Sequence, residues 1–265
     1  MRKGSSKEWP LIDAYGIVRQ TMLPVYARPK TDSSLVTQLL FGECYLLTGL
    51  TANREWFKVF HEDSQLGGWV WAKSIKEITA EAYANFLNPD FQVVTSPIAA
   101  IDYQGAHLYL LPGSRLHFSE MELFNWQDHL GFTGTYRPFT VKTNREELLE
   151  LALRFLNAPF QAGGRSIFGM DAQHVFPLIF WIGGYHLSPG KLPGVQIAPE
   201  ELEAGDLLVA RDPYEQQDHY ALYLGSEQVF WMDHRMQTTD LDDWEDFLRE
   251  STENELEISM HSVVG

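Results

Sequence analysis

The chain has 265 residues, of which 45% are hydrophobic and 21% charged, values typical of a globular protein with one to three domains. Its formal net charge of −16 repels phosphate backbones and anionic lipid surfaces, so we expect neither nucleic-acid binding nor membrane insertion. The single cysteine, Cys44, allows no internal disulfide, and no cysteine or histidine cluster has zinc-site spacing. We therefore expect no metal and no cofactor.

The segment from Met1 to Trp9 is polar and charged and lacks the apolar core of a signal peptide. No stretch of about 18 apolar residues occurs elsewhere. We expect a cytoplasmic protein if Met1 is the native start, and a periplasmic or extracellular one if a signal peptide has been removed.

Short strands are predicted between residues 15 and 75. The apolar or alternating runs are Tyr15–Leu23, Val36–Leu40, Tyr45–Thr48, Trp56–Phe60 and Trp69–Ala72. Runs this short and evenly spaced favour a small β-barrel. Cys44 lies at one of these strands, which predicts a buried, unreactive thiol.

Three motifs occur in order within these strands. A Gly42-Glu43 turn is followed by Trp56-Phe57-Lys58-Val59 and then by Gly67-Gly68-Trp69-Val70. This series resembles a bacterial SH3 domain, in which a Gly-Glu turn precedes a Trp-x-Lys-Val strand and a Gly-Trp-Val strand. The resemblance implies an SH3-like domain over residues 1–78.

Residues 79–140 predict a short helix and further strands. The helix is expected at Ala80–Leu87, before Pro89. The strands are expected at Phe91–Val94, Ile98–Asp102, Leu108–Leu111, Arg115–Phe118 and Phe132–Tyr136. This region is expected to be a second SH3-like β domain, and the alternative is an extension of a neighbouring domain.

The pattern changes at Val141. Thr143 and Glu146 have capping-box spacing, and an apolar helix face then runs to Asn157-Ala158-Pro159. A domain boundary is therefore expected near Thr140, with a third domain over residues 141–265.

Further elements of the third domain are a helix from about residue 172 and an antiparallel sheet. The expected strands of that sheet are Leu207–Ala210, His219–Leu224 and Val229–Met232. The acidic run Asp240 to Glu245 predicts a helix start, with Thr238 or Thr239 near its cap.

Four ordered landmarks mark this third domain. They are Pro159-Phe160-Gln161-Ala162-Gly163-Gly164, Gly169-Met170-Asp171, Ala204-Gly205-Asp206-Leu207, and Asp218-His219-Tyr220-Ala221-Leu222-Tyr223-Leu224-Gly225. Together they resemble the NlpC family of papain-like cell-wall cysteine peptidases. The resemblance implies a multidomain protein in which all-β, SH3-like barrels precede an α+β papain-like domain. It also implies acyl transfer after γ-D-glutamate in L-Ala-γ-D-Glu-diamino acid peptides.

The catalytic positions implied by this resemblance are degenerate. Such an active site needs a cysteine at a helix start, a histidine base and a third polar side chain that orients the imidazole. The nucleophile position is Ala172, whose methyl group cannot attack a carbonyl. His219 retains the base position, but the third position is Trp231, whose indole N–H cannot accept a proton.

The cleft positions implied by the resemblance are Phe160, Ala162, Asp171, Gln173, His174 and Asp218. Of these, Phe160, Ala162, Gln173 and His174 differ from the family pattern, whereas Asp171 and Asp218 belong to the landmarks above. Leu187-Ser188-Pro189-Gly190 aligns with a family motif whose charges hold the substrate's amino terminus, and both charges are missing. Pro177 would remove a hydrogen bond from a helix that starts at Ala172, at a cost of about 3 kcal/mol. So many simultaneous changes indicate natural degeneracy rather than an engineered Cys→Ala substitution.

Three functions stay open. The first is a non-catalytic homologue that binds a cell-wall peptide or a protein partner in the former cleft, between the SH3-like part and the third domain. The second is a hydrolase of cell-wall peptides with rearranged residues, such as Ser166 or a metal held by His174, His219 and His234 with Asp218 or Asp233. The third is a structural adaptor with an occluded cleft. Ser166 is more simply a loop-capping hydroxyl.

Overall fold

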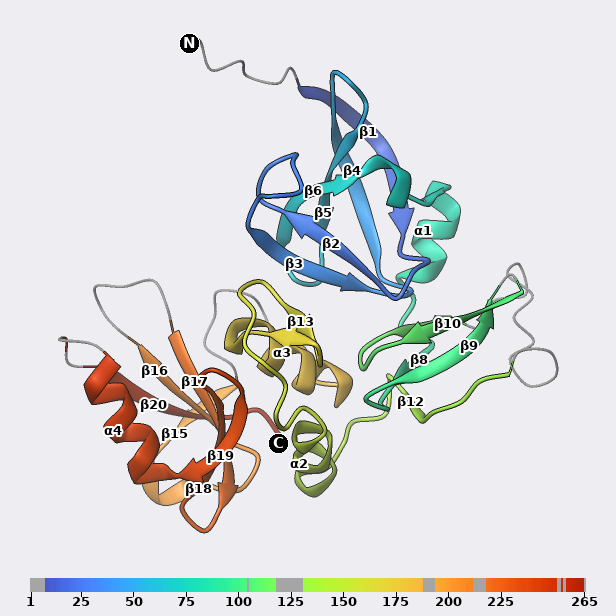
Figure 1. Ribbon diagram of the computed structural model, residues 1–265. Helices are drawn as coiled ribbons and strands as arrows, with labels where there is room; N and C mark the ends of the chain where they lie inside the picture. The colour runs from blue at the N-terminus through green and yellow to red at the C-terminus, as the bar shows by residue number, and fades with distance from the viewer. Residues whose placement is uncertain are drawn as a thin grey trace, which may run out of the picture. The chain divides into compact units, whose positions relative to one another are not determined.

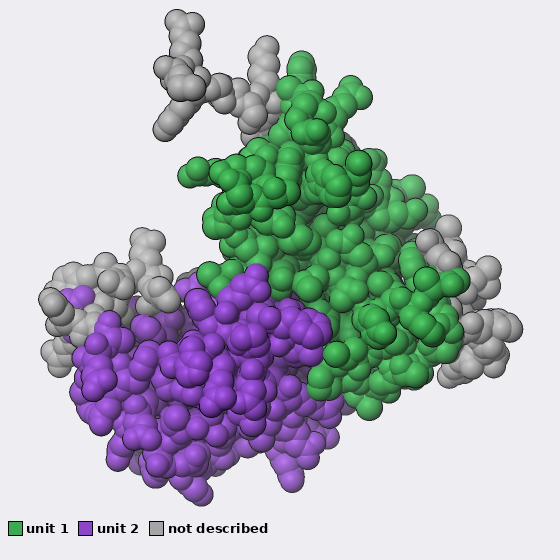
Figure 2. Space-filling view, viewed as in Figure 1, with its two compact units in different colours: residues 1–140, 162–164 green, residues 141–161, 165–265 purple. Residues whose placement is uncertain are grey.

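The computed structural model describes residues 8–103, 105–117, 131–187, 194–211, 218–251, 254 and 256–264 (Figure 1). Its contacts divide the chain into two compact units, which Figure 2 colours separately. Unit 1 contains residues 1–140 and 162–164, and unit 2 contains residues 141–161 and 165–265. None of the described helices is long and apolar enough to cross a membrane.

The first part of unit 1 is a seven-stranded antiparallel sheet. Its strands are β1 (Glu8–Ile17), β2 (Met22–Tyr26), β3 (Leu35–Leu40), β4 (Cys44–Thr51), β5 (Trp56–His61), β6 (Leu66–Trp71) and β7 (Glu77–Ile78). They pair in the order β3-β2-β6-β5-β4-β1-β7, which has two ends rather than closing into a ring. Leu23, Leu39, Tyr45 and Val70 are among the residues of its core.

Two predictions for this sheet have clear outcomes. Cys44 is buried, as predicted, and burial raises the pKa of its thiol to about 12. The single strand predicted over Tyr15–Leu23 is wrong, because β1 ends at Ile17 and β2 starts at Met22. Val18 lies between these strands and exchanges two backbone hydrogen bonds with the Gly42-Glu43 turn.

The second part of unit 1 contains α1 (Ala80–Phe86) and five short strands. The strands are β8 (Phe91–Val94), β9 (Ala99–Tyr103), β10 (Ala106–Leu110), β11 (Arg115–His117) and β12 (Tyr136–Pro138). They form a β10-β9 hairpin and a β11-β8-β12 sheet. α1 starts as predicted, with the Thr79 hydroxyl accepting from the Ala82 amide at 3.1 Å. Phe118, the last residue of the predicted fourth strand, lies outside the described residues. The three-domain division stays a prediction.

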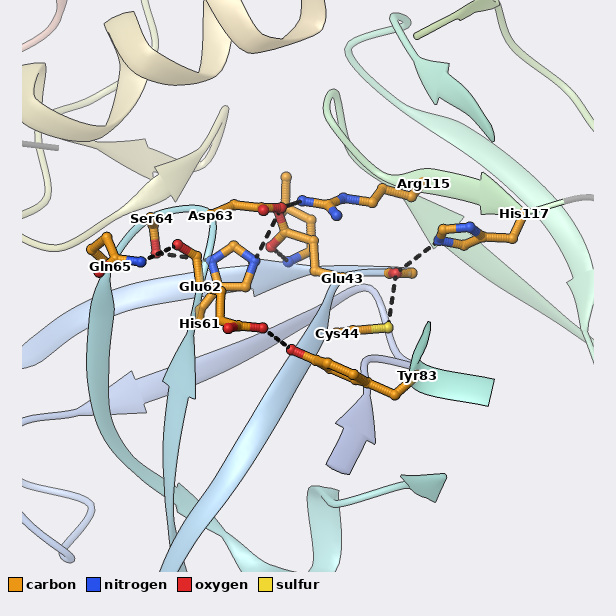
Figure 3. A network of polar contacts seen from close by, with 12 residues as sticks. Glu43, Cys44, His61, Glu62, Asp63, Ser64, Gln65, Tyr83, Arg115 and His117 are labelled. Carbon is orange, nitrogen blue, oxygen red and sulfur yellow. Dashed lines mark hydrogen bonds and ion pairs between the residues drawn. The ribbon is translucent and has the colours of Figure 1, made fainter. Parts of the chain in front are cut away.

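A buried arginine joins the two parts of unit 1 (Figure 3). The Arg115 side chain is 5% exposed, and its guanidinium forms ion pairs with Asp63 and, at 3.6 Å, with Glu43, which is fully buried. The second carboxylate oxygen of Glu43 accepts from the Leu40 amide at 2.8 Å. A buried ion is tolerated only when its charge is balanced, so this cluster requires all three residues.

The turn needs a glycine at position 42 because the backbone of Arg115 passes close to it. Gly42 has a φ of 82°, and a Cβ added there would lie 2.2 Å from the Arg115 carbonyl oxygen. That oxygen belongs to backbone, which cannot move aside cheaply. The Gly42 carbonyl oxygen in turn accepts from Nε2 of His117 at 3.1 Å. Burial lowers the pKa of His117 to about 3, so this imidazole is neutral at pH 7.

We expect Arg115→Met to destabilise the protein by about 3–5 kcal/mol, because Glu43 would keep a buried, unbalanced charge. Arg249 is the matched control, since its side chain is 66% exposed and pairs only at the surface with Glu245 and Asp246. Arg249→Met should cost less than about 1 kcal/mol. Chemical denaturation measures both, and equal costs would contradict the role given to Arg115.

Unit 2 is a six-stranded antiparallel sheet with helices. The helices are α2 (Arg145–Leu153), α3 (Ala172–Ile182) and α4 (Leu241–Ser251). The sheet strands are β15 (Val195–Ile197), β16 (Leu207–Arg211), β17 (Asp218–Gly225), β18 (Gln228–Met232), β19 (Met236–Asp240) and β20 (Glu257–Ser262), in the order β15-β20-β16-β17-β18-β19. A small hairpin, β13 (Arg165–Ser166) with β14 (Gly169–Met170), precedes α3. The described part of the chain is thus multi-sheet and mostly β, with few helices.

The predicted capping box of α2 is displaced by one residue. The N-cap is Asn144, whose side chain accepts from the Glu147 amide at 2.9 Å while Glu147 accepts from the Asn144 amide at 3.1 Å. Thr143 is buried, and its hydroxyl donates to the Gly183 carbonyl oxygen instead. The helix is also shorter than predicted and ends at Leu153, well before Asn157, which has a φ of 67°.

The start of α4 differs from its prediction in a similar way. Thr238 and Thr239 belong to β19, and α4 follows directly at Leu241. Strand pairing uses these threonines, since Thr238 lies opposite Phe230 and Thr239 opposite Val229. They therefore do not cap the helix.

Candidate functional site

The start of α3 is the position that the sequence analysis assigned to a nucleophile. Asp171 is the N-cap residue, and its carboxylate accepts from the His174 amide at 3.1 Å and contacts His174 Nδ1 at 2.5 Å. Ala172 is the first helical residue and is partly exposed. A negative charge at this point already satisfies the free amides and the positive end of the helix dipole.

Pro177 lies inside α3, as the sequence predicted for a helix that starts at Ala172. Proline has no N–H, so the usual bond to the Gln173 carbonyl oxygen cannot form. The helix tolerates the proline because burial of its many apolar side chains stabilises it. The residues Val175, Phe176, Leu178, Ile179, Phe180, Trp181 and Ile182 are all buried. Pro177 and Gln173 are exposed.

Two helices, α3 and α4, pack on opposite faces of the sheet of unit 2. Phe176 of α3 contacts Tyr220 of β17 and Phe230 of β18, with ring centroids 6.1 Å and 6.4 Å apart. On the other face, Ala221 of β17 and Trp231 of β18 share a hydrophobic cluster with Trp244 of α4. Successive side chains of a strand point to opposite faces, so β17 and β18 present alternate residues to α3 and to α4.

The alternation along β17 determines where His219 points. β17 pairs regularly with β16, Asp218 lying opposite Arg211, His219 opposite Ala210, and Tyr220 opposite Val209. Since Tyr220 faces α3, His219 projects to the face that carries Ala210 and Ala221, the face covered by α4. Strand alternation therefore assigns the His219 side chain to the sheet face opposite the one on which α3 packs.

Trp231, the predicted third position, is a core residue. Its side chain is 4% exposed, and its ring lies 4.5 Å from that of Phe247 on α4. Its Nε1–H donates to the Thr239 hydroxyl at 2.9 Å. The indole thus uses its one donor within the sheet and fills the volume that an orienting side chain would need.

The α3 face of β17 carries a polar cluster of which the sequence predicted only Asp218 as a site residue. Arg211 binds Asp218 through two hydrogen bonds, Nε–Oδ1 at 2.8 Å and Nη2–Oδ2 at 2.6 Å. The Tyr220 hydroxyl donates to the same carboxylate at 3.3 Å. The hydrogen bonds from Arg211 hold the pKa of Asp218 below its usual range, whereas burial raises the pKa of Tyr220 to about 12. Strict alternation through Asp218, His219 and Tyr220 was the signal that could have revealed this cluster.

The other predicted cleft residues have different outcomes. Phe160 is brought to the start of α3, since it forms a parallel bridge with Met170, the residue before Asp171, and its side chain is 53% exposed. Ala162 belongs by its contacts to unit 1. Ser166 is buried in β13 rather than lying in an open loop. Ser188, Pro189 and Gly190 lie outside the described residues.

Histidines and carboxylates form pairs rather than a metal centre. His174 pairs with Asp171, and the exposed His234 pairs with Asp233 at 2.7 Å. Among the residues that the structure describes, no three or more His, Cys, Asp or Glu side chains lie close enough together to hold a metal ion.

Comparisons with known proteins identify the fold by structure and not by sequence. No protein-family model matches the sequence, and no curated protein matches it. The structure resembles an NlpC/P60 family protein from Bacillus cereus, with a TM-score of 0.72 and 17% identity over 95% of this chain and 100% of that one. It also resembles an NlpC/P60 endopeptidase from Photobacterium damselae subsp. piscicida, with a TM-score of 0.69 and 12% identity over 95% of this chain and 73% of that one. The fold is therefore that of NlpC/P60 proteins.

A third similar structure covers less of the chain. It is RipD from Mycobacterium tuberculosis, described as a non-catalytic NlpC/p60 domain protein adapted to peptidoglycan binding. The match has 23% identity and a TM-score of 0.32 over 46% of this chain and 98% of that one.

We expect Trp231→His, which restores a polar third position, to destabilise the protein by about 2–4 kcal/mol, because it leaves a cavity beside Phe247 and Trp244. The control is Trp9→His, since Trp9 is 58% exposed and its replacement should cost under about 1 kcal/mol. Thermal or chemical denaturation measures the loss of stability in both variants. A Trp231→His protein as stable as the control would show that position 231 is not a core site.

Proposed function

We propose that this protein is a non-catalytic relative of NlpC/P60 cell-wall peptidases, which binds a cell-wall peptide or a protein partner with the region around the start of α3. Within this proposal, residues 1–78 and 79–140 are SH3-like domains and residues 141–265 are a papain-like domain. The Gly42-Glu43, Trp56-x-Lys58 and Gly68-Trp69 motifs support the first of these assignments, since they occur at β3–β4, β5 and β6 in sequence order.

The observation that carries the proposal is the residue at the start of α3. A papain-like peptidase attacks its substrate with a thiolate that the helix N-terminus stabilises. Ala172 is the first residue of α3 and offers only a methyl group, which cannot attack a carbonyl. The missing thiol opposes nucleophilic catalysis at this point.

The sheet adds two independent arguments. His219 lies on a strand position that faces α4, and Trp231 packs into the same α4-facing core. A base acts only when it reaches the nucleophile within hydrogen-bond distance, and the third residue acts only when it hydrogen-bonds the imidazole. Loss of the nucleophile, the orienter and the favourable face together supports binding rather than hydrolysis.

The proposal predicts no dipeptide release when the protein is incubated with L-Ala-γ-D-Glu-diamino acid peptides, because no nucleophile is available. It also predicts weak or no affinity for an L-Ala-D-Glu amino terminus by calorimetry. Cosedimentation with purified peptidoglycan, with bovine serum albumin as the control protein, tests the binding part.

Dipeptide release that His219→Ala abolishes would contradict the proposal and favour a rearranged hydrolase. Micromolar affinity for the L-Ala-D-Glu amino terminus would show that the ancestral specificity persists. No release, no cosedimentation and no captured partner would favour a structural adaptor.

A further inference from the structure

The proposed function gives no role to the cluster of Arg211, Asp218 and Tyr220 on the α3 face of the sheet. Tyr220 contacts Phe176 of α3, which is four residues after Ala172. Residues four apart on a helix share one side, so Ala172 and Phe176 point the same way. The residues of β17 that accompany Tyr220 on this face therefore lie on the side of α3 toward which Ala172 points.

Asp218 shares this face with Tyr220, as their hydrogen bond of 3.3 Å requires. The Asp218 side chain is only 18% exposed, and Arg211 holds it from the paired position on β16. The side chain between them, His219, points to the other face. The strand β17 thus presents a carboxylate and a phenol on one face and an imidazole on the other.

We infer that Tyr220, held by the Asp218–Arg211 pair, and not His219, is the group of β17 that meets a ligand bound at the start of α3. The ligand part of this inference rests on the proposed function. A guanidinium has five N–H donors, and the pair with Asp218 uses only two N–H···O contacts. The position therefore favours ligand groups that accept hydrogen bonds, such as peptide carbonyl or carboxylate oxygens, and it lacks a general base.

A thiol placed at residue 172 tests the assignment without any ligand. In Ala172→Cys, the pKa of the introduced thiol is measured from the pH dependence of its alkylation. The native Cys44 is buried and serves as the unreactive background in wild-type protein. The same measurement is repeated with His219→Ala, with Asp218→Asn and with the exposed control His234→Ala. Asp171 and His174 flank residue 172 in every variant and cancel in the comparison.

The inference predicts that His219→Ala and His234→Ala leave the pKa of the introduced thiol unchanged to within about 0.3 unit. Alternation assigns the His219 side chain to the opposite face of β17, and the His234 side chain is exposed and pairs with Asp233. Asp218→Asn should lower the pKa of this thiol by about half a unit, because it leaves the Arg211 charge unbalanced on the same face. Circular dichroism confirms folding, and His219→Gln replaces His219→Ala if that variant unfolds.

A change of about one unit or more with His219→Ala would overturn the inference, since it would mean that imidazole and thiolate are paired. No shift with Asp218→Asn would also overturn it, by removing the cluster from the neighbourhood of residue 172. If peptidoglycan binds, Tyr220→Phe should weaken binding about tenfold and His219→Ala should not. If peptidoglycan does not bind, the proposed function fails while the thiol measurement still decides the assignment.

Discussion

The contact of Phe176 with Tyr220 and Phe230 determines which side chains of unit 2 can meet a ligand at the start of α3. It sets which face of the central sheet meets α3, and alternation along β17 and β18 then sets the direction of every neighbouring side chain. Tyr220 and Asp218 face the helix, whereas His219 and Trp231 face α4. The chemistry around the start of α3 therefore follows from aromatic packing several residues away from Ala172.

Unit 1 depends on a different kind of constraint, a buried charge. Arg115 requires Glu43 and Asp63, and Gly42 allows the approach of the Arg115 backbone. These residues come from the Gly-Glu turn, from the loop after β5 and from β11. Local periodicity contains no information on such a pairing, since its partners are far apart in sequence. The Gly-Glu turn was visible in the sequence, but its partner was not.

Strands were the most predictable elements, because short apolar runs between turn residues have few alternative structures. β8 was predicted at its observed bounds, and β16, β17 and β18 to within one residue at either end. Helix ends were less predictable. Thr143 and Asn144 are both good caps, and burial of Thr143 against Gly183 gives the cap to Asn144. Motif alignment identified Ala172 and His219 but could not show which sheet face each one uses, because face assignment depends on where α3 packs.

The central claim is that catalysis was lost through the surroundings of residue 172 as well as through the missing sulfur. The most direct test is dipeptide release from L-Ala-γ-D-Glu-diamino acid peptides by Ala172→Cys, after alkylation has shown that the new thiol is accessible. The account predicts no release above the wild-type level, because His219 faces α4 and Trp231 fills the third position. Release that appears in Ala172→Cys and disappears when His219→Ala is added to that variant would contradict it.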